Sequence, residues 1–364
     1  MKYIEEFRNP EKQRKIVELI IESAKFINFK ITLMEVCGTH TITIGKYGIR
    51  KLMPKNIHLV SGPGCPVCVT PVDYIDIAIE LSKRNDVIVT TFGDLMRVPG
   101  SFSTLEKEKA NGGKIVVLYS PFDALNIAKK YPDKNIIFLS VGFETTTPSI
   151  AQTIKFAKRE RIKNFYILVG NKLIPPILEF LLKKKEININ GFICPGHVSV
   201  IIGTEAYKFI PEKYKIPCVI SGFEPLDILY SIYLLLKCII ENKIVVINEY
   251  KRAVKDKGNT KAKEMIYEIF DVCDSEWRGI GIVPKSGLKL KEEFLDFDVL
   301  KKFKVEVKRK IKNNKCLCGE ILKGTKLPFD CPLFGKKCTP ENPVGPCMVS
   351  SEGTCSAYFK YERK

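Results

Sequence analysis

Short runs of β-branched residues alternate with helical segments from about residue 57 to residue 247, and this alternation constrains the fold more than any other feature of the sequence. The runs are apolar throughout, as expected of strands that are buried on both faces. The pattern therefore predicts an α/β fold in which parallel sheets are covered by helices. The expected strands are 57–60, 87–90, 115–119, 136–141, 165–169, 191–194, 218–220 and 244–247, and the expected helices are 10–27, 74–82, 124–130, 150–160 and 174–184.

A turn motif recurs after three of the predicted strands. In each case a proline is followed two residues later by an aspartate, and an apolar helix begins there. Proline at the first helical position and an acid in the first turn both favour a helix start, so unrelated turns can converge on this motif. The alternative is two related, Rossmann-like α/β domains whose loops face one cleft, since such sheets bind ligands at the carboxyl ends of their strands. The three motifs are Pro71-Val-Asp73, Pro121-Phe-Asp123 and Pro225-Leu-Asp227.

Six of the thirteen cysteines lie within the last 49 residues, in a loop-rich tail that follows the end of the strand–helix alternation near residue 282. A tail with so few periodic apolar residues needs another source of folding free energy, and metal ligation can supply it. The tail lacks the Cys-x2-Cys knuckle of zinc sites, and its irregular gaps suit a 4Fe–4S cluster better than zinc or a set of disulfides. Spacing alone does not select four ligands from the six: Cys316, Cys318, Cys331, Cys338, Cys347 and Cys355.

Cys65 and Cys68 form a Cys-x-x-Cys motif between a predicted strand and a predicted helix. Thiolates at a helix N-terminus are stabilised by backbone N–H groups and by the helix dipole, so this context is typical of a thiol redox pair. Two buried core cysteines are the alternative.

Cys37 and His40 stand three residues apart in a second motif near the N-terminus. The two side chains could bind one metal ion, or the imidazole could activate the thiol. Of the other histidines, His197 follows a strand end and is a candidate for the same cleft, whereas His58 lies in an apolar strand and is expected to be structural.

The net charge of +18 does not by itself indicate a nucleic-acid partner. A nucleic-acid-binding protein concentrates its charge on one face, whereas lysine here is spread along the chain and is dense only at 301–315, so a solvated lysine-rich surface is the better account. An acidic protein partner stays open. No secretory signal is visible, and charges interrupt the longest apolar stretch, 228–247, so neither export nor a membrane span is expected. We therefore expect a cytoplasmic protein, in which grouped cysteines bind metal or perform redox chemistry.

Taken together, the motifs resemble the HypD family of hydrogenase maturation factors, through long matches along nearly the whole chain. They are Glu35-Val-Cys-Gly-Thr-His-Thr41, Ser61-Gly-Pro-Gly-Cys-Pro-Val-Cys68, Thr91-Phe-Gly-Asp-Leu-Met-Arg-Val-Pro-Gly-Ser101, Val141-Gly-Phe-Glu-Thr-Thr146, Pro195-Gly-His-Val-Ser199, Gly222-Phe-Glu-Pro-Leu-Asp227, Asp330-Cys-Pro-Leu-Phe-Gly335 and Gly345-Pro-Cys-Met-Val-Ser-Ser-Glu-Gly-Thr-Cys355.

This resemblance implies a role in assembling the Fe(CN)2(CO) unit of nickel–iron hydrogenases. In that family the iron is held between the protein and a small chaperone, HypC, and the cyanide donor HypE then docks onto the complex. The family fold is two related α/β domains, which we expect at 25–135 and 136–250, and a 4Fe–4S domain, which we expect at 281–364 packed with the helix at 10–27.

The resemblance also implies roles for the cysteines. The family's cluster pattern, Cys-x14-Cys-x6-Cys-x16-Cys, selects four ligands and leaves two cysteines as a spare thiol pair. By similarity to ferredoxin–thioredoxin reductase, electrons would pass from the cluster through that pair to the front redox pair. Iron would be carried by Cys37, with His40 nearby and with Cys65 and Cys68 also at the iron site. The cluster ligands are then Cys316, Cys331, Cys338 and Cys355, and the spare pair is Cys318 and Cys347.

Four polar residues at predicted strand ends could donate or accept hydrogen bonds near the bound diatomic ligands: Asp94, Arg97, Glu144 and Glu224. Helix starts explain such acids equally well. Two other functions also stay open, a stand-alone thiol–disulfide oxidoreductase supplied by the cluster and an iron–sulfur scaffold with no redox role.

Overall fold

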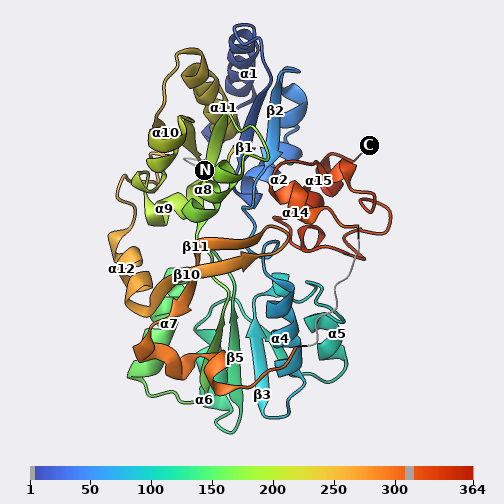
Figure 1. Ribbon diagram of the computed structural model, residues 1–364, viewed down its shortest axis with the longest axis vertical. Coiled ribbons are helices and arrows are strands. Elements are labelled where there is room, and N and C mark those ends of the chain that lie inside the picture. The colour runs from blue at the N-terminus through green and yellow to red at the C-terminus, as the bar shows by residue number, and fades with distance from the viewer. Residues whose placement is uncertain (1–4, 308–314, 364) are drawn as a thin grey trace.

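The computed structural model describes residues 5–307 and 315–363. Two parallel sheets, each covered by helices, follow one another along the long axis of the molecule, and the loop-rich cysteine segment packs beside one of them (Figure 1). The predicted fold class, two parallel-sheet α/β domains with a loop-rich C-terminal part, is confirmed. The middle of the lysine-dense stretch 301–315 lies outside the described residues.

The first sheet, sheet A, has the strand order β2-β1-β7-β8-β9, and every neighbouring pair is parallel. Its strand β1, which lies between β2 and β7, is buried along its whole length and was missing from the predicted strands. The strands are β1 (Ile31–Glu35), β2 (Ile57–Ser61), β7 (Gly191–Pro195), β8 (Cys218–Ser221) and β9 (Val246–Asn248).

The second sheet, sheet B, has the order β4-β3-β5-β6 and is also parallel throughout. Its core strands are buried on both faces, as their uninterrupted apolar character predicts. The strands are β3 (Val87–Thr91), β4 (Ile115–Val117), β5 (Asn135–Ser140) and β6 (Phe165–Val169).

The chain builds two strands of sheet A, then all of sheet B, and then returns to complete sheet A. The predicted division into 25–135 and 136–250 is therefore wrong. The physical reason is strand pairing: β5 lies in register beside β3, while β7 lies beside β1. Alternation of strands and helices predicts parallel sheets, but it does not say which strands become neighbours.

Helix α1 (Pro10–Ala24) begins at an Asn9 cap and packs along α11 (Pro225–Ile240) on sheet A. Its buried side chain Ile20 shares an apolar cluster with Ile228 of α11. The prediction that this helix packs with the cysteine-rich part is therefore wrong. The other helices that cover the sheets include α4 (Val72–Ser82), α6 (Asp123–Lys130), α7 (Thr147–Arg159) and α8 (Ile174–Lys184).

An antiparallel hairpin, β10 (Phe270–Trp277) and β11 (Gly281–Leu290), crosses between the two sheets (Figure 1). Trp277 is fully buried there, and its Nε1 donates to Ser286 Oγ at 2.7 Å. The cysteine-rich segment follows with α14 (Cys318–Leu322), the 3-10 turn η6 (Pro346–Met348) and α15 (Thr354–Tyr361), and α15 packs against α2 (Gly38–Lys46) of sheet A. Among residues 5–307 and 315–363, no helix has the length and apolar character needed to cross a membrane.

Candidate metal and thiol site

Cys37 is the N-cap residue of α2, directly after the buried strand β1. Burial raises the pKa of its thiol to about 12, and the nearby carboxyl of Glu352 adds to the rise, while the backbone N–H groups of Thr39 and His40 act in the opposite direction. The free protein therefore keeps this thiol protonated. A bound cation would supply the charge that favours the thiolate.

Glu35 is a buried carboxyl beneath Cys37 that the sequence analysis did not single out. Its Oε2 accepts from the Cys37 N–H at 3.2 Å, and its Oε1 accepts from Thr41 Oγ1 at 2.5 Å. Burial raises the pKa of Glu35 to about 7. The carboxyl thus ties the end of β1 to the first turn of α2 and fixes the backbone that carries Cys37.

His40 is fully buried and is anchored to the loop after β8. Its Nε2 donates to the carbonyl oxygen of Gly222 at 2.9 Å, and its ring lies 5.0 Å from that of Phe223. Burial lowers the pKa of His40 to about 4, so the imidazole is neutral near pH 7. Its Nδ1 is buried and has no hydrogen-bond partner in the described parts of the chain.

Cys37 lines a cleft of about 510 Å³ between loops that follow strands of both sheets. Asp94 and Phe143 come from the side of sheet B, and His197 follows β7 of sheet A. His197 was expected in the cleft with Cys37. It lines this cleft and is stacked on Phe223, with 3.9 Å between the ring centroids. Glu352 also lines the cleft, from the C-terminal segment.

Cys65 and Cys68 form a disulfide in the turn between β2 and α4. Because α4 begins only at Val72, the thiol at a helix N-terminus is Cys37 rather than either member of this pair. Gly64 brings the pair to Cys37: a Cβ on Gly64 would lie 2.5 Å from the Cys37 backbone nitrogen. Only glycine therefore permits this approach of the two loops.

The disulfide also contacts the C-terminal cysteine segment. The Sγ of Cys68 lies 4.0 Å from the carbonyl oxygen of Pro346, and the next residue, Cys347, is fully buried. Hydrogen bonding with Cys318 and Cys355 raises the pKa of Cys347. Hydrogen bonding with Cys318 and, to a smaller extent, with Cys347 lowers the pKa of Cys355 to about 6.

Five of the six C-terminal cysteines interact with one another. The Sγ atoms of Cys316 and Cys318 are 3.2 Å apart, and both act electrostatically on Cys338, whose Sγ accepts from the Val344 N–H at 3.3 Å. Cys331 is buried in the turn that leads to Cys338.

This donor set fits the chemistry of an iron–sulfur cluster, which needs four cysteine thiolates in a site wrapped by loops. These contacts do not distinguish the predicted spare pair, Cys318 and Cys347, from the predicted cluster ligands. Cys318 contacts the predicted ligand Cys316, and Cys347 contacts the predicted ligand Cys355. Within residues 5–307 and 315–363, no three His, Cys, Asp or Glu side chains form a site for a single metal ion.

Three of the four predicted polar residues hold the fold together. Glu144 Oε1 accepts from the first N–H of α8 at 2.9 Å. Glu224 forms an ion pair with Arg8, and Arg97 donates to the carbonyl oxygens of Pro340 and Glu341. Only the fourth, Asp94, lies at the cleft, where it accepts from Ser350 Oγ at 3.2 Å.

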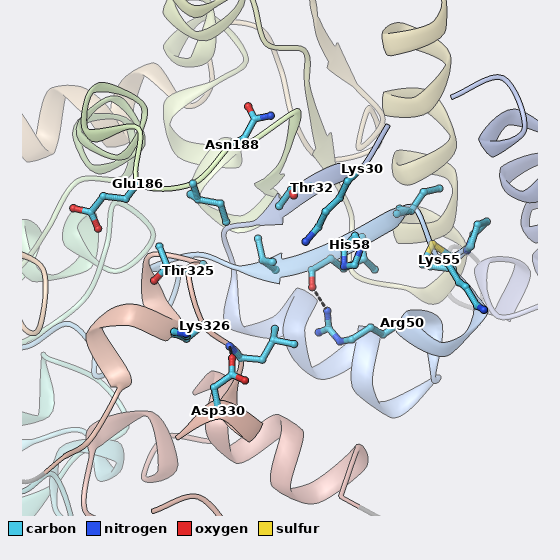
Figure 2. A pocket seen from close by; sticks show the side chains of 18 residues that line it. Lys30, Thr32, Arg50, Lys55, His58, Glu186, Asn188, Thr325, Lys326 and Asp330 are labelled. Atoms are coloured by element: carbon cyan, nitrogen blue, oxygen red, sulfur yellow. Dashed lines mark hydrogen bonds between the residues drawn. The ribbon is translucent and has the colours of Figure 1, made fainter. Parts of the chain in front are cut away.

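A second pocket, of about 600 Å³, runs along the edge strand β2 (Figure 2). Arg50 donates a hydrogen bond to the carbonyl oxygen of Leu59 there. Basic and acidic side chains are mixed around it, among them Lys30, Lys326 and Glu186, and no cysteine lines it. The cleft at Cys37 is therefore the candidate site.

The chain is similar to known proteins along nearly its whole length. The family model HypD, described as the hydrogenase formation hypA family, matches residues 11–362. The hydrogenase maturation factor HypD of Azotobacter vinelandii is 43% identical over 100% of this chain and 98% of its own. The proteins of the same name from Cupriavidus necator and Escherichia coli are 43% and 40% identical over 100% of this chain, and over 98% and 99% of theirs.

Proposed function

This chain belongs to the HypD family of hydrogenase maturation factors, and we propose that it is the scaffold and redox protein for assembling the Fe(CN)2(CO) unit of nickel–iron hydrogenases. The iron is cargo, held at Cys37 in a complex with a small HypC-type chaperone. A HypE-type protein delivers the cyanide. One observation carries the proposal: the Cys65–Cys68 disulfide lies between the two other cysteine groups. On one side, the preceding Gly64 packs against the backbone of Cys37, and on the other side Cys68 contacts Pro346, the residue before Cys347.

The chemistry of Cys37 supports this role. A low-spin iron with cyanide and carbonyl ligands suits a soft thiolate, and thiolate donation enriches the metal in electrons for binding carbon monoxide. Since the pKa of the free thiol is about 12, iron binding releases a proton from Cys37. The N–H groups at the start of α2 stabilise the thiolate that results, and Glu35 holds the helix start in place.

The C-terminal segment supports the redox part of the proposal. Cys316, Cys331, Cys338 and Cys355 would hold a 4Fe–4S cluster, which supplies single electrons when bound. The thiols of Cys318 and Cys347 would reduce the front disulfide by exchange. One thiolate attacks a sulfur of the Cys65–Cys68 bond, the second then breaks the mixed disulfide, and two thiols form at the front while one disulfide forms at the back.

An infrared spectrum of the protein purified with its HypC-type partner tests the cargo site. Cyanide and carbonyl stretching bands are expected for the wild type and for Cys238→Ala, a matched change of a buried cysteine on α11. The bands should disappear in Cys37→Ala. Bands of full intensity in Cys37→Ala would show that another residue carries the iron.

The relay needs its own test. Replacing Cys318 and Cys347 together should slow reduction of the Cys65–Cys68 disulfide, followed by alkylation of the released thiols. An unaltered rate would refute the relay and leave the cargo site standing. Loss of Cys316 should lower the iron and sulfide content, whereas loss of Cys318 should not.

The Cys65–Cys68 disulfide also suits a stand-alone thiol–disulfide oxidoreductase. Hydrogenase maturation that survives Cys37→Ala but fails in Cys65→Ala would favour that second function.

A further inference from the structure

Arg278 lies in the turn between β10 and β11 and contacts the loops around the front disulfide. Its backbone N–H donates to the carbonyl oxygen of Val69, the residue after Cys68, at 2.9 Å. Its Nη2 donates to the carbonyl oxygen of Pro99 at 3.0 Å. The other guanidinium nitrogen, Nη1, is buried and has no hydrogen-bond partner within the described residues.

The other side of Arg278 faces the cysteine-rich segment. Arg278, Cys316 and Cys318 line one cavity of about 620 Å³. The turn of the hairpin touches the start of α14 so closely that a Cβ on Gly319 would lie 2.1 Å from the Gly279 carbonyl oxygen. Neither glycine can therefore carry a side chain without separating Arg278 from the cysteines.

The electrostatics agree with this placement. Burial lowers the pKa of Arg278, and the sulfurs of Cys318, Cys347 and Cys316 act in the opposite direction. A guanidinium remains protonated in proteins, so the charge is present whatever the pH. A buried donor without an acceptor is costly unless an anion faces it.

We propose that Arg278 is a positioning residue whose charge balances the thiolates of the cysteine-rich site and holds that site against the Cys65–Cys68 loop. A purely structural arginine would place all of its buried donors on acceptors, whereas Arg278 donates Nη2 to the Pro99 carbonyl oxygen and leaves buried Nη1 without an acceptor within the described residues. The inference rests on the proposed function only in requiring thiolates at this site, and not on which metal they bind.

Cadmium binding to the reduced, metal-free full-length protein tests the proposal, followed by the cadmium–thiolate absorption band. The cadmium–thiolate complex is anionic, so Arg278→Gln should weaken binding by about tenfold. Arg278→Lys keeps the charge and should bind nearly as the wild type does. Arg159→Gln, which changes an exposed arginine on α7, is the control, and its affinity should not change.

Equal affinities in wild type and Arg278→Gln would overturn the proposal. An equal loss in Arg278→Gln and Arg278→Lys would also overturn it, because shape rather than charge would then matter. If Arg278→Gln does not fold, Arg278→Lys alone decides, since a tenfold loss in that variant contradicts a role for charge.

The cluster gives a second measurement and separates this inference from the proposed function. In reconstituted protein, Arg278→Gln should shift the midpoint potential to a more negative value, by 59 mV for a tenfold change in a one-electron couple. A wild type that binds cadmium but takes up no iron and sulfide would contradict the cluster and leave the role of Arg278 intact.

Discussion

His40 makes the stability of the unliganded protein depend on pH, and the size of the effect follows from its burial. Burial lowers the pKa of His40 from 6.5 to about 4 in the folded state. Between these pH values the unfolded chain binds a proton at His40 and the folded chain does not. The stabilisation that neutral His40 provides is therefore fully present above pH 6.5 and is lost as the pH falls toward 4. At about 1.36 kcal/mol per pKa unit the full loss is about 3 kcal/mol, of which about 2 kcal/mol is lost by pH 5.

His40→Gln isolates this contribution, because the amide of glutamine can donate to the Gly222 carbonyl oxygen as Nε2 does but does not titrate. Urea unfolding at pH 7.5 and pH 5, followed by fluorescence of the single tryptophan, gives the free energy of unfolding of each protein. The advantage of wild type over variant should shrink by about 2 kcal/mol between the two pH values. The buried Glu35 titrates in both proteins and cancels in the difference.

His58→Gln is the comparison variant. Partial burial and the nearby Lys30 lower the pKa of His58, but its side chain is exposed on β2, so its change should alter the pH dependence less than His40→Gln does. A difference between wild type and His40→Gln that stays constant from pH 7.5 to pH 5 would refute the reasoning. It would mean that the folded protein protonates His40 as readily as the unfolded chain does.

Three further changes test packing and hydrogen bonding around the site. Gly38→Ala should lower the melting temperature although alanine favours helices, because its Cβ would lie 2.3 Å from the Glu352 carbonyl oxygen; a raised melting temperature would contradict that clash. Thr41→Val removes the hydroxyl that donates to buried Glu35 and should cost about 1–3 kcal/mol in urea unfolding, whereas a neutral result would mean that Glu35 finds another donor. Lys172 is buried, and burial lowers its pKa from 10.5 to about 8, so its contribution is lost as the pH falls through 8. The stability of wild type relative to Lys172→Met should therefore rise by about 2 kcal/mol from pH 8 to pH 10, and a flat difference would show an ordinary lysine pKa.

Local sequence patterns predicted most strands and helices, and in some cases their exact limits. The strand 165–169 and the helix 174–184 coincide with β6 and α8, because uninterrupted apolar runs and a helical period are local properties. The hairpin of β10 and β11 was not predicted, because acidic residues at irregular spacing interrupt the apolar positions of β10. The pairing of β1 with β7 depends on contacts between distant segments, so no local pattern could reveal it.

The site also combines residues that local motifs reveal with residues that only long-range folding brings together. Motif spacing singled out Cys37, the front pair and the C-terminal cysteines, and the structure brings the three groups onto adjacent segments. Glu35 and Glu352 stand within matched motifs but were missed as site residues, because only folding buries them beside Cys37. Arg278 was missed for the same reason, since its neighbours come from three separate segments.

The insertion of sheet B into sheet A has a consequence for how a nascent chain folds. The N–H of Thr32 bonds to the side chain of Asn190, 158 residues later. At ~5–20 residues per second, β1 is synthesised roughly 8 to 30 seconds before its partner β7. Sheet B comes from one continuous stretch of chain and can form during that interval. Until β7 is made, β1 and β2 have an unpaired apolar strand edge, which promotes aggregation. The segment of this protein most in need of a chaperone during synthesis is therefore the one that carries Cys37.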